Sequence, residues 1–192
     1  MKRLLAVIAG SLALSACAGV PSPTPGVASE PVSATAPALA ACGDETPPPD
    51  APVYAFFSCA DLPGGADPRP VPRVAHAADP VTRLESAVIG LLGGPNEAER
   101  EAGYFSFFSE VTALALNEVS IEPDGTAVVD LGDIRGLIPN ASSSAGSELL
   151  LAQLNATAFQ VAEVTGVEYR IDGSCEAFWE WLQRSCEIVP RP

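Results

Sequence analysis

The sequence predicts an α+β fold in which two main helices pack on one face of a small mixed β-sheet. Short apolar runs bounded by proline, glycine and aspartate indicate strands. Residues 79–92 and 142–164 carry apolar side chains at the spacing of a buried helix face. Between them, residues 123–125 (Pro-Asp-Gly) separate two strand-like runs as a hairpin turn does. The folded domain is expected to span residues 53–192.

The first sixteen residues have the layout of a signal peptide. Lys2 and Arg3 precede an apolar stretch that is shorter than the roughly 20 residues of a membrane-spanning helix. Residues 14–17 (Leu-Ser-Ala-Cys) resemble the lipobox of bacterial lipoproteins. That resemblance implies that residues 1–16 are removed by cleavage before Cys17 and that Cys17 is diacylated. Two acyl chains are enough to anchor a protein stably in a membrane. We expect a lipid anchor at the extracytoplasmic face of the cell membrane; the alternative is a chance cysteine after an ordinary signal peptide.

Residues 17–52 are expected to form a lipidated cysteine followed by a disordered tether. Beyond Cys17 the segment consists mainly of alanine, proline, serine, threonine, valine and glycine. Such a composition buries too little apolar surface to offset the entropy of ordering the chain. Its proline-rich stretches favour extended conformations, so the tether should act as a semi-rigid spacer.

The domain itself begins with two predicted strands and a helix. Residues 53–58 (VYAFFS) form a short apolar run typical of a buried strand, and residues 70–75 indicate an edge strand because they contain prolines. Asp79 and Pro80 are a helix start, with aspartate as the N-cap. The apolar stripe of this helix consists of Val81, Leu84, Val88 and Leu91.

A short charged helix and an aromatic run follow. Asn96 should cap the helix, with Glu99 as its capping-box partner, and the charged interior predicts a surface position. Residues 104–108 (YFSFF) could form a strand or a loop that packs into the core, or could remain exposed as a partner site. Residues 117–122 and 126–132 are the two strands of the hairpin.

The longest helix is predicted over residues 142–164, with Ser144 or Ser147 as its cap. A strand at residues 167–171 follows, then a turn and a cysteine-bounded segment rich in aromatic residues. The expected buried stripe of the helix consists of Leu150, Leu154, Thr157 and Val161, flanked by Leu149, Ala152, Ala156 and Phe159.

Four cysteines remain after lipidation of Cys17, and an even number in an exported protein predicts two disulfides. Three connectivities are possible, and we favour the pairs that are local in sequence, Cys42–Cys59 and Cys175–Cys186. No metal site or cofactor is expected, because neither spacing resembles the clustered ligands of a zinc site.

The charge of the chain restricts its partners. The formal charge is −14, and it becomes about −16 when Lys2 and Arg3 leave with the signal peptide. A surface of this kind repels nucleic acid, so no nucleic-acid partner is expected. It favours cations and basic protein surfaces.

No catalytic constellation is recognisable. The only histidine, His76, lies in a predicted loop, and the G-x-S-x-G motif of serine hydrolases is absent. The glutamates at residues 97, 99 and 101 are more simply the solvated face of a surface helix than paired catalytic carboxylates. Asp124, Asp130 and Asp133 lack the ligand spacing of an EF-hand loop, so at most weak calcium binding is expected. The protein is not expected to be an enzyme.

Three segments together resemble the GerMN domain, the sporulation and germination domain of bacterial envelope lipoproteins. They are LLGGPNEAEREAG (residues 91–103), VSIEPDGTAVVDLG (119–132) and LLLAQLNATAFQVAEVTGVEYRIDG (149–173). The resemblance covers about residues 53–173. It implies a fold similar to ring-building modules of secretion and sporulation assemblies, and no enzyme activity. It also implies a membrane-tethered module that contacts envelope proteins or the cell wall.

Two functions follow from the sequence. The first is a non-catalytic protein-interaction or assembly module of the cell envelope, supported by the resemblance and the tether. The second is binding of a small ligand or of peptidoglycan through Trp179, Trp181 and the aromatic run at residues 104–108, since sugars stack on aromatic faces. The partner and the oligomeric state do not follow from the sequence.

Overall fold

The structure is a computed structural model that describes residues 41–42, 53–60, 67–76 and 78–192. The predicted signal peptide, Cys17 and all of the expected tether except Ala41 and Cys42 lie outside the described residues. The strands are β1 (Val53–Cys59), β2 (Arg69–Arg73), β3 (Tyr104–Phe105), β4 (Leu116–Ile121), β5 (Thr126–Leu131), β6 (Gly166–Ile171) and β7 (Val189–Pro190). The helices are α1 (Pro80–Leu92), α2 (Glu97–Glu101), α3 (Ser144–Phe159) and α4 (Cys175–Trp181).

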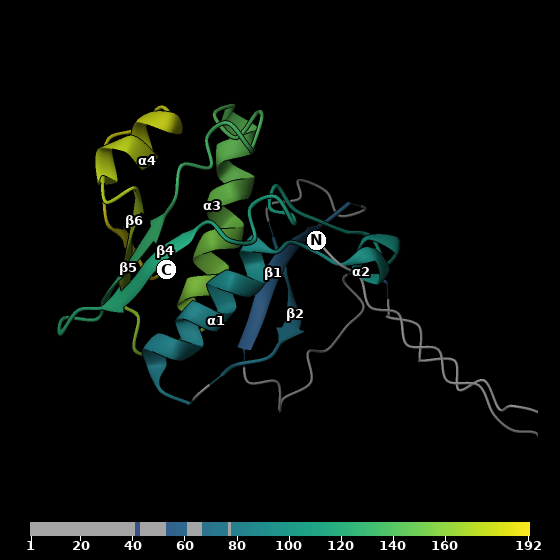
Figure 1. Ribbon diagram of the computed structural model, residues 1–192, viewed down its shortest axis with the longest axis horizontal. Helices are drawn as coiled ribbons and strands as arrows, with labels where there is room; N and C mark the ends of the chain where they lie inside the picture. Colours follow the sequence, from purple (N-terminus) through teal and green to yellow (C-terminus); the bar gives the residue numbers. More distant parts are fainter. Residues whose placement is uncertain (1–40, 43–52, 61–66, 77) are drawn as a thin grey trace, which may run out of the picture. The chain divides into compact units, whose positions relative to one another are not determined.

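The first sheet has the strand order β2-β1-β3, with β1 antiparallel to both neighbours. Figure 1 shows β1 and β2 side by side. β1 pairs with β2 from Val53 to Phe57, but with β3 only at Ser58 and Cys59. The predicted position of β2 at the edge is confirmed, because a strand with prolines lacks donors for a second ladder.

The second sheet has the order β4-β5-β6-β7. β4 and β5 form the predicted hairpin, in which Gly125 takes φ +88° and the Asp124 carboxylate accepts a hydrogen bond from the Thr126 amide. β5 and β6 are parallel, so the chain must cross between them, and α3 makes this crossover. The two-residue strand β7 was not predicted, since no local pattern marks so short an edge strand.

Side chains of α3, rather than another strand, cover part of the second edge of β1. The amide of Tyr54 donates to the Gln160 Oε1 atom at 2.7 Å, and Gln160 Nε2 donates to the Tyr54 carbonyl at 2.6 Å. The Phe56 amide donates to the Thr157 hydroxyl at 3.2 Å. The predicted α+β class is confirmed, but the strands form two sheets because α3 takes the place of a pairing strand along this edge.

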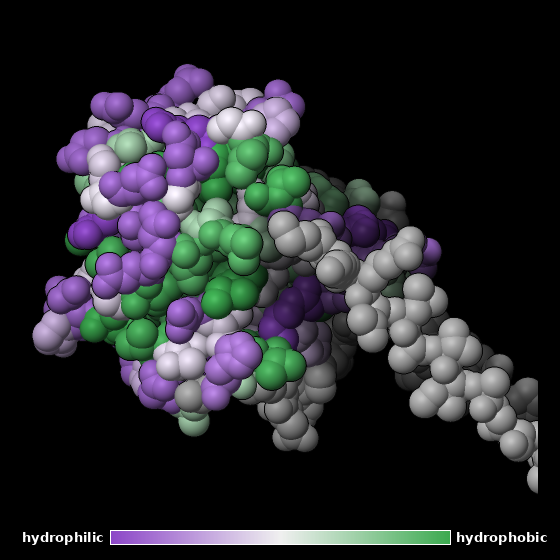
Figure 2. Space-filling view, viewed as in Figure 1, coloured by the Kyte–Doolittle hydropathy of each residue, from purple (hydrophilic) through white to green (hydrophobic). Residues whose placement is uncertain are grey.

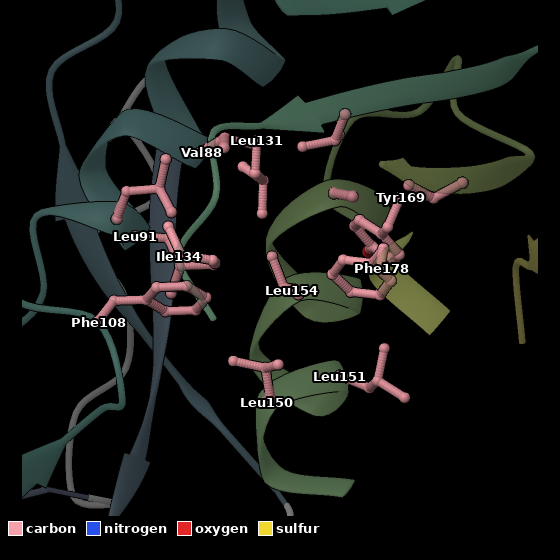
Figure 3. Close-up of a cluster of buried hydrophobic side chains, with 14 of the residues drawn as sticks. Val88, Leu91, Phe108, Leu131, Ile134, Leu150, Leu151, Leu154, Tyr169 and Phe178 are labelled. Carbon is pink, nitrogen blue, oxygen red and sulfur yellow. The ribbon is translucent and has the colours of Figure 1, made fainter. Parts of the chain in front are cut away.

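The hydrophobic core lies between the helices and the inner face of the second sheet (Figure 3). α1 and α3 contact each other and β1, while α1 also contacts β4 and α3 contacts β6. The predicted stripes are buried except at Val81, which is 37% exposed because it lies in the first turn of α1. The residues expected to flank the α3 stripe are only partly buried. Labelled core residues in Figure 3 are Val88, Leu91, Phe108, Leu131, Ile134, Leu150, Leu151, Leu154, Tyr169 and Phe178.

The predicted caps of the first two helices are confirmed. Asp79 accepts from the Thr82 amide, and Asn96 and Glu99 form a reciprocal capping box. The predicted cap of α3 was wrong, because Ser143 and not Ser144 or Ser147 accepts from a backbone amide of the first turn. α3 also ends at Phe159, earlier than the predicted residue 164.

The structure contains the two expected disulfides, Cys42–Cys59 and Cys175–Cys186, with Cα–Cα distances of 5.6 and 5.5 Å. The first joins the segment before β1 to the end of that strand, and the Cys42 amide also donates to the Ala102 carbonyl. The second closes a loop around α4.

Candidate interaction surface

The outer face of α1 is partly apolar and exposed. Leu84, Val88 and Leu91 point into the core, whereas Val81 and Ile89 are 37% and 42% exposed. Val81 and Ile89 lie two helical turns apart, so they share one face of the helix.

The turn segment 109–115 adds a second apolar component. Its anchor is the buried Thr112, whose hydroxyl donates to the Leu92 carbonyl at 2.7 Å at the end of α1. Gly94 allows this close approach, since a Cβ there would lie 2.3 Å from the Phe108 carbonyl oxygen. With the turn fixed in this way, Val111 and Leu114 point to solvent and are 66% and 97% exposed.

These elements border a groove of about 210 Å³. Figure 2 shows hydrophobic side chains gathered in the middle of the face on which α1 and β4 lie. We call this region the α1–β4 surface. The groove is lined by Glu85, Ile89, Ala113, Leu114, Leu116 and Asn117.

The aromatic run at residues 104–108 serves both the core and a second cavity. Tyr104 and Phe108 are buried, whereas Phe105 is half-buried and lines a cavity of about 360 Å³. Ser106 holds the run in place because its hydroxyl donates to the buried Gln153 at 2.6 Å. Arg100 also lines this mostly apolar cavity.

The predicted role of Trp179 in stacking on a ligand was wrong. Its side chain is 0% exposed and packs edge-to-face against Phe178, so no sugar can reach its ring. Trp181 is half-buried and also packs against Phe178. The aromatic residues of α4 therefore serve mainly to fix the C-terminal segment on β6.

The prediction that Glu99 lies on a solvated helix face was also wrong. Glu99 is only 4% exposed, and its carboxylate forms a bidentate ion pair with the Arg73 guanidinium at 2.7 and 2.8 Å. The Arg73 guanidinium also lies 5.2 Å from the centre of the Phe57 ring. This pair joins α2 to β2, while Glu97 and Glu101 remain exposed.

The aspartates considered for calcium are engaged locally. Asp130 accepts from the Gly173 amide, and Asp124 accepts from the Thr126 amide, which lowers the pKa of that carboxyl group. Asp133 is bonded to Arg135, which lowers the pKa of Asp133 to about 2. Among the described residues, no three metal-binding side chains converge. His76 is exposed, and its backbone amide contacts Ser86.

The described part of the chain thus defines a two-sheet α+β domain with exposed apolar residues at the α1–β4 surface. The sequence profile of the family described as sporulation and spore germination (Germane) matches residues 56–175, which is more than half of the chain. The protein therefore belongs to this family, as the resemblance to GerMN domains predicted.

Solved structures of GerMN domains are similar to this chain. The tandem GerMN domains of the sporulation protein GerM from Bacillus subtilis are 18% identical with a TM-score of 0.45, and the match covers 73% of this chain. It covers 44% of that structure, so this chain spans less than half its length. The first GerMN domain of the same protein is 20% identical with a TM-score of 0.38, over 63% of this chain and 84% of the domain. No curated protein sequence matches the chain.

Proposed function

We propose that the protein is a non-catalytic interaction module, held by a lipid on Cys17 at the extracytoplasmic face of the cell membrane. The observation that carries this proposal is the α1–β4 surface, where Leu114 is 97% exposed. A contiguous exposed apolar patch on a soluble domain is typical of a protein-binding site. The acidic composition around it favours a basic partner surface.

Crosslinking in native membranes tests the interaction. The reagent must couple carboxylates, because the only lysine of the sequence is Lys2 in the predicted signal peptide. We expect a reproducible protein partner crosslinked to carboxylates beside the α1–β4 surface, and its loss in Leu114→Asp. Ile188→Asp is the matched control, since Ile188 is also an exposed apolar residue, at 53%, but precedes β7 at the opposite edge of the sheet. Crosslinks confined to the chain itself would contradict the proposal.

The lipid anchor is tested separately. Within the described residues, no helix has both the length and the apolar character needed to cross a membrane. If Cys17 carries the anchor, Cys17→Ser should release the protein from the membrane fraction or leave its precursor uncleaved. Membrane retention of a normally processed Cys17→Ser protein would overturn this part of the proposal.

A second candidate function is binding of a small ligand or of peptidoglycan at the cavity beside β3. The supporting observation is the half-buried Phe105 at a mostly apolar cavity of about 360 Å³, a volume within the range of small-molecule sites. Peptidoglycan sedimentation with Phe105→Ala and with the unchanged protein tests this function. Retention that depends on Phe105 would favour it, and absence of retention would exclude a cell-wall ligand at this cavity.

A further inference from the structure

We propose that β4 binds an extended basic segment of a partner protein by β-strand addition, with the partner's apolar side chains in the groove beside α1. This inference rests on the proposed function and specifies its binding mode and the chemistry of the partner. In this mode, backbone hydrogen bonds at a free sheet edge supply affinity, and alternate side chains supply specificity.

The first argument is which backbone N–H and C=O groups of β4 point away from β5. Among the residues that the structure describes, β4 is the outermost strand of its sheet and pairs with β5 alone. The Glu122 amide donates to the Thr126 carbonyl at 2.8 Å, which fixes the alternation of bonded and non-bonded pairs. Val119 and Ile121, paired with Val129 and Ala127, are therefore non-bonded pairs, and their N–H and C=O groups point away from β5 toward the free edge.

The second argument is what lies beside this edge. A strand added to β4 would project alternate side chains over α1, on the side where Ile89 and Leu114 are exposed. Leu116 and Asn117, at the start of β4, line the same groove. The inward-facing residues of the partner are therefore apolar, and burying them would cover the exposed Leu114.

The third argument is charge. Glu85 lines the groove, while Glu118 and Glu122 are exposed on and just after β4. Lysine or arginine at the outward-facing positions of the partner would lie near Glu118 and Glu122, so the favoured segment alternates apolar and basic residues. A second copy of this chain is disfavoured, because pairing two β4 edges would bring the glutamates of one copy close to those of the other.

The length of the added strand is limited at both ends. A register shift between Leu116 and Glu118 interrupts the regular ladder at the beginning of β4. Pro123 ends the strand at the other side, because it lacks a backbone donor. Pairing is thus confined to about residues 118–122, which suits a short linear segment rather than a long strand.

The test uses the full chain in detergent and a fluorescent seven-residue peptide of alternating valine and lysine. Two peptides of the same net charge serve as controls: one with the valines and lysines grouped into blocks, and one with N-methylated amides on the pairing edge. We expect the alternating peptide to bind at least about tenfold more tightly than either control. Binding should also slow amide hydrogen exchange at Val119 and Ile121.

Two variants locate the site. Leu114→Asp and Glu118→Lys should each weaken binding about tenfold, because one removes the apolar contact and the other reverses a charge. Glu148→Lys, an exposed glutamate on α3, should bind like the unchanged protein. The inference would be overturned if the N-methylated peptide bound as tightly as the alternating one. It would also be overturned by unchanged amide hydrogen exchange at Val119 and Ile121, or by a dimer of this chain formed through β4. If one of these results were found while a partner still crosslinked to the α1–β4 surface, strand addition would be excluded. The proposed function as an interaction module would remain supported.

Discussion

Gln160 makes hydrogen bonds to both backbone groups of Tyr54, 106 residues earlier in the chain. The side-chain amide has one acceptor and two donors, so it can satisfy an N–H and a C=O of the same strand residue as a neighbouring strand would. One turn earlier on α3, Thr157 bonds to the Phe56 amide. A polar stripe of the helix thus completes the hydrogen bonding of β1 where β3 no longer reaches it.

Replacing Gln160 should therefore destabilise the fold. In Gln160→Ala the two backbone groups of Tyr54 lose their partners, and we expect the free energy of unfolding to fall by about 1–3 kcal/mol. Gln160→Glu should be at least as harmful, since a carboxylate oxygen would face the Tyr54 carbonyl in place of a donor. Urea denaturation measures both changes, with the exposed Glu163→Ala as control. Unchanged stability in both Gln160 variants would show that the edge of β1 needs no partner.

The buried ion pair between Arg73 and Glu99 should be strongly coupled. Removing one partner leaves a charge in a poorly hydrated position, so Glu99→Gln should lower the free energy of unfolding by about 3 kcal/mol. Arg73→Leu combined with Glu99→Gln should recover part of this loss, because neither charge is then stranded. A double-mutant cycle measures the coupling, and strictly additive effects of the single variants would contradict it.

The Cys175–Cys186 disulfide should stabilise the C-terminal segment by about 2–3 kcal/mol, mainly by restricting the unfolded chain. We expect the double variant Cys175→Ala/Cys186→Ala to melt at a lower temperature, with faster amide exchange in α4 than in α1. Identical melting of this variant and the unchanged protein would contradict the expectation.

Asp133 provides a prediction about pH. Its hydrogen bonds to Arg135 lower the pKa of the Asp133 carboxyl group in the folded protein to about 2, below its ordinary value of 3.8. A lowered pKa means that the stabilising contribution of Asp133 is fully present above pH 3.8 and is lost as the pH falls through about 2. Arg135→Gln should raise the pKa toward 3.8, which NMR titration of the carboxyl carbon measures. Asp124, whose pKa is lowered by bonds to Thr126, should titrate unchanged in that variant.

The parts of the fold that the sequence predicted are those with local signals. Three of these signals involve only neighbours within a few positions: Asp79 before a proline, the capping box of Asn96 and Glu99, and the turn at residues 123–125. The hydrophobic stripes of α1 and α3 likewise follow from helical periodicity. The α+β class could therefore be predicted without knowledge of any distant contact.

The features that the sequence did not reveal depend on distant partners. Glu99 is buried because Arg73 meets it from a strand 26 residues earlier, and in sequence it resembles any glutamate of a surface helix. Trp179 fills the core because the crossover brings β6 beside α4, whereas a tryptophan in an isolated segment fits a binding role equally well. The candidate surface was missed for the same reason, since the exposure of Leu114 depends on the anchoring of Thr112 to α1.

The position of the Cys42–Cys59 disulfide determines how the domain responds to mechanical force. Tension arriving along the N-terminal segment reaches Cys42 and passes through the sulfur atoms to Cys59, at the far end of β1. The force is therefore carried by the covalent disulfide and not by the hydrogen bonds between β1 and β2, which begin at Val53. A pull on the N-terminus therefore cannot peel β1 from its sheet one bond at a time. Under reducing conditions the same pull would enter at Val53 and unzip the strand.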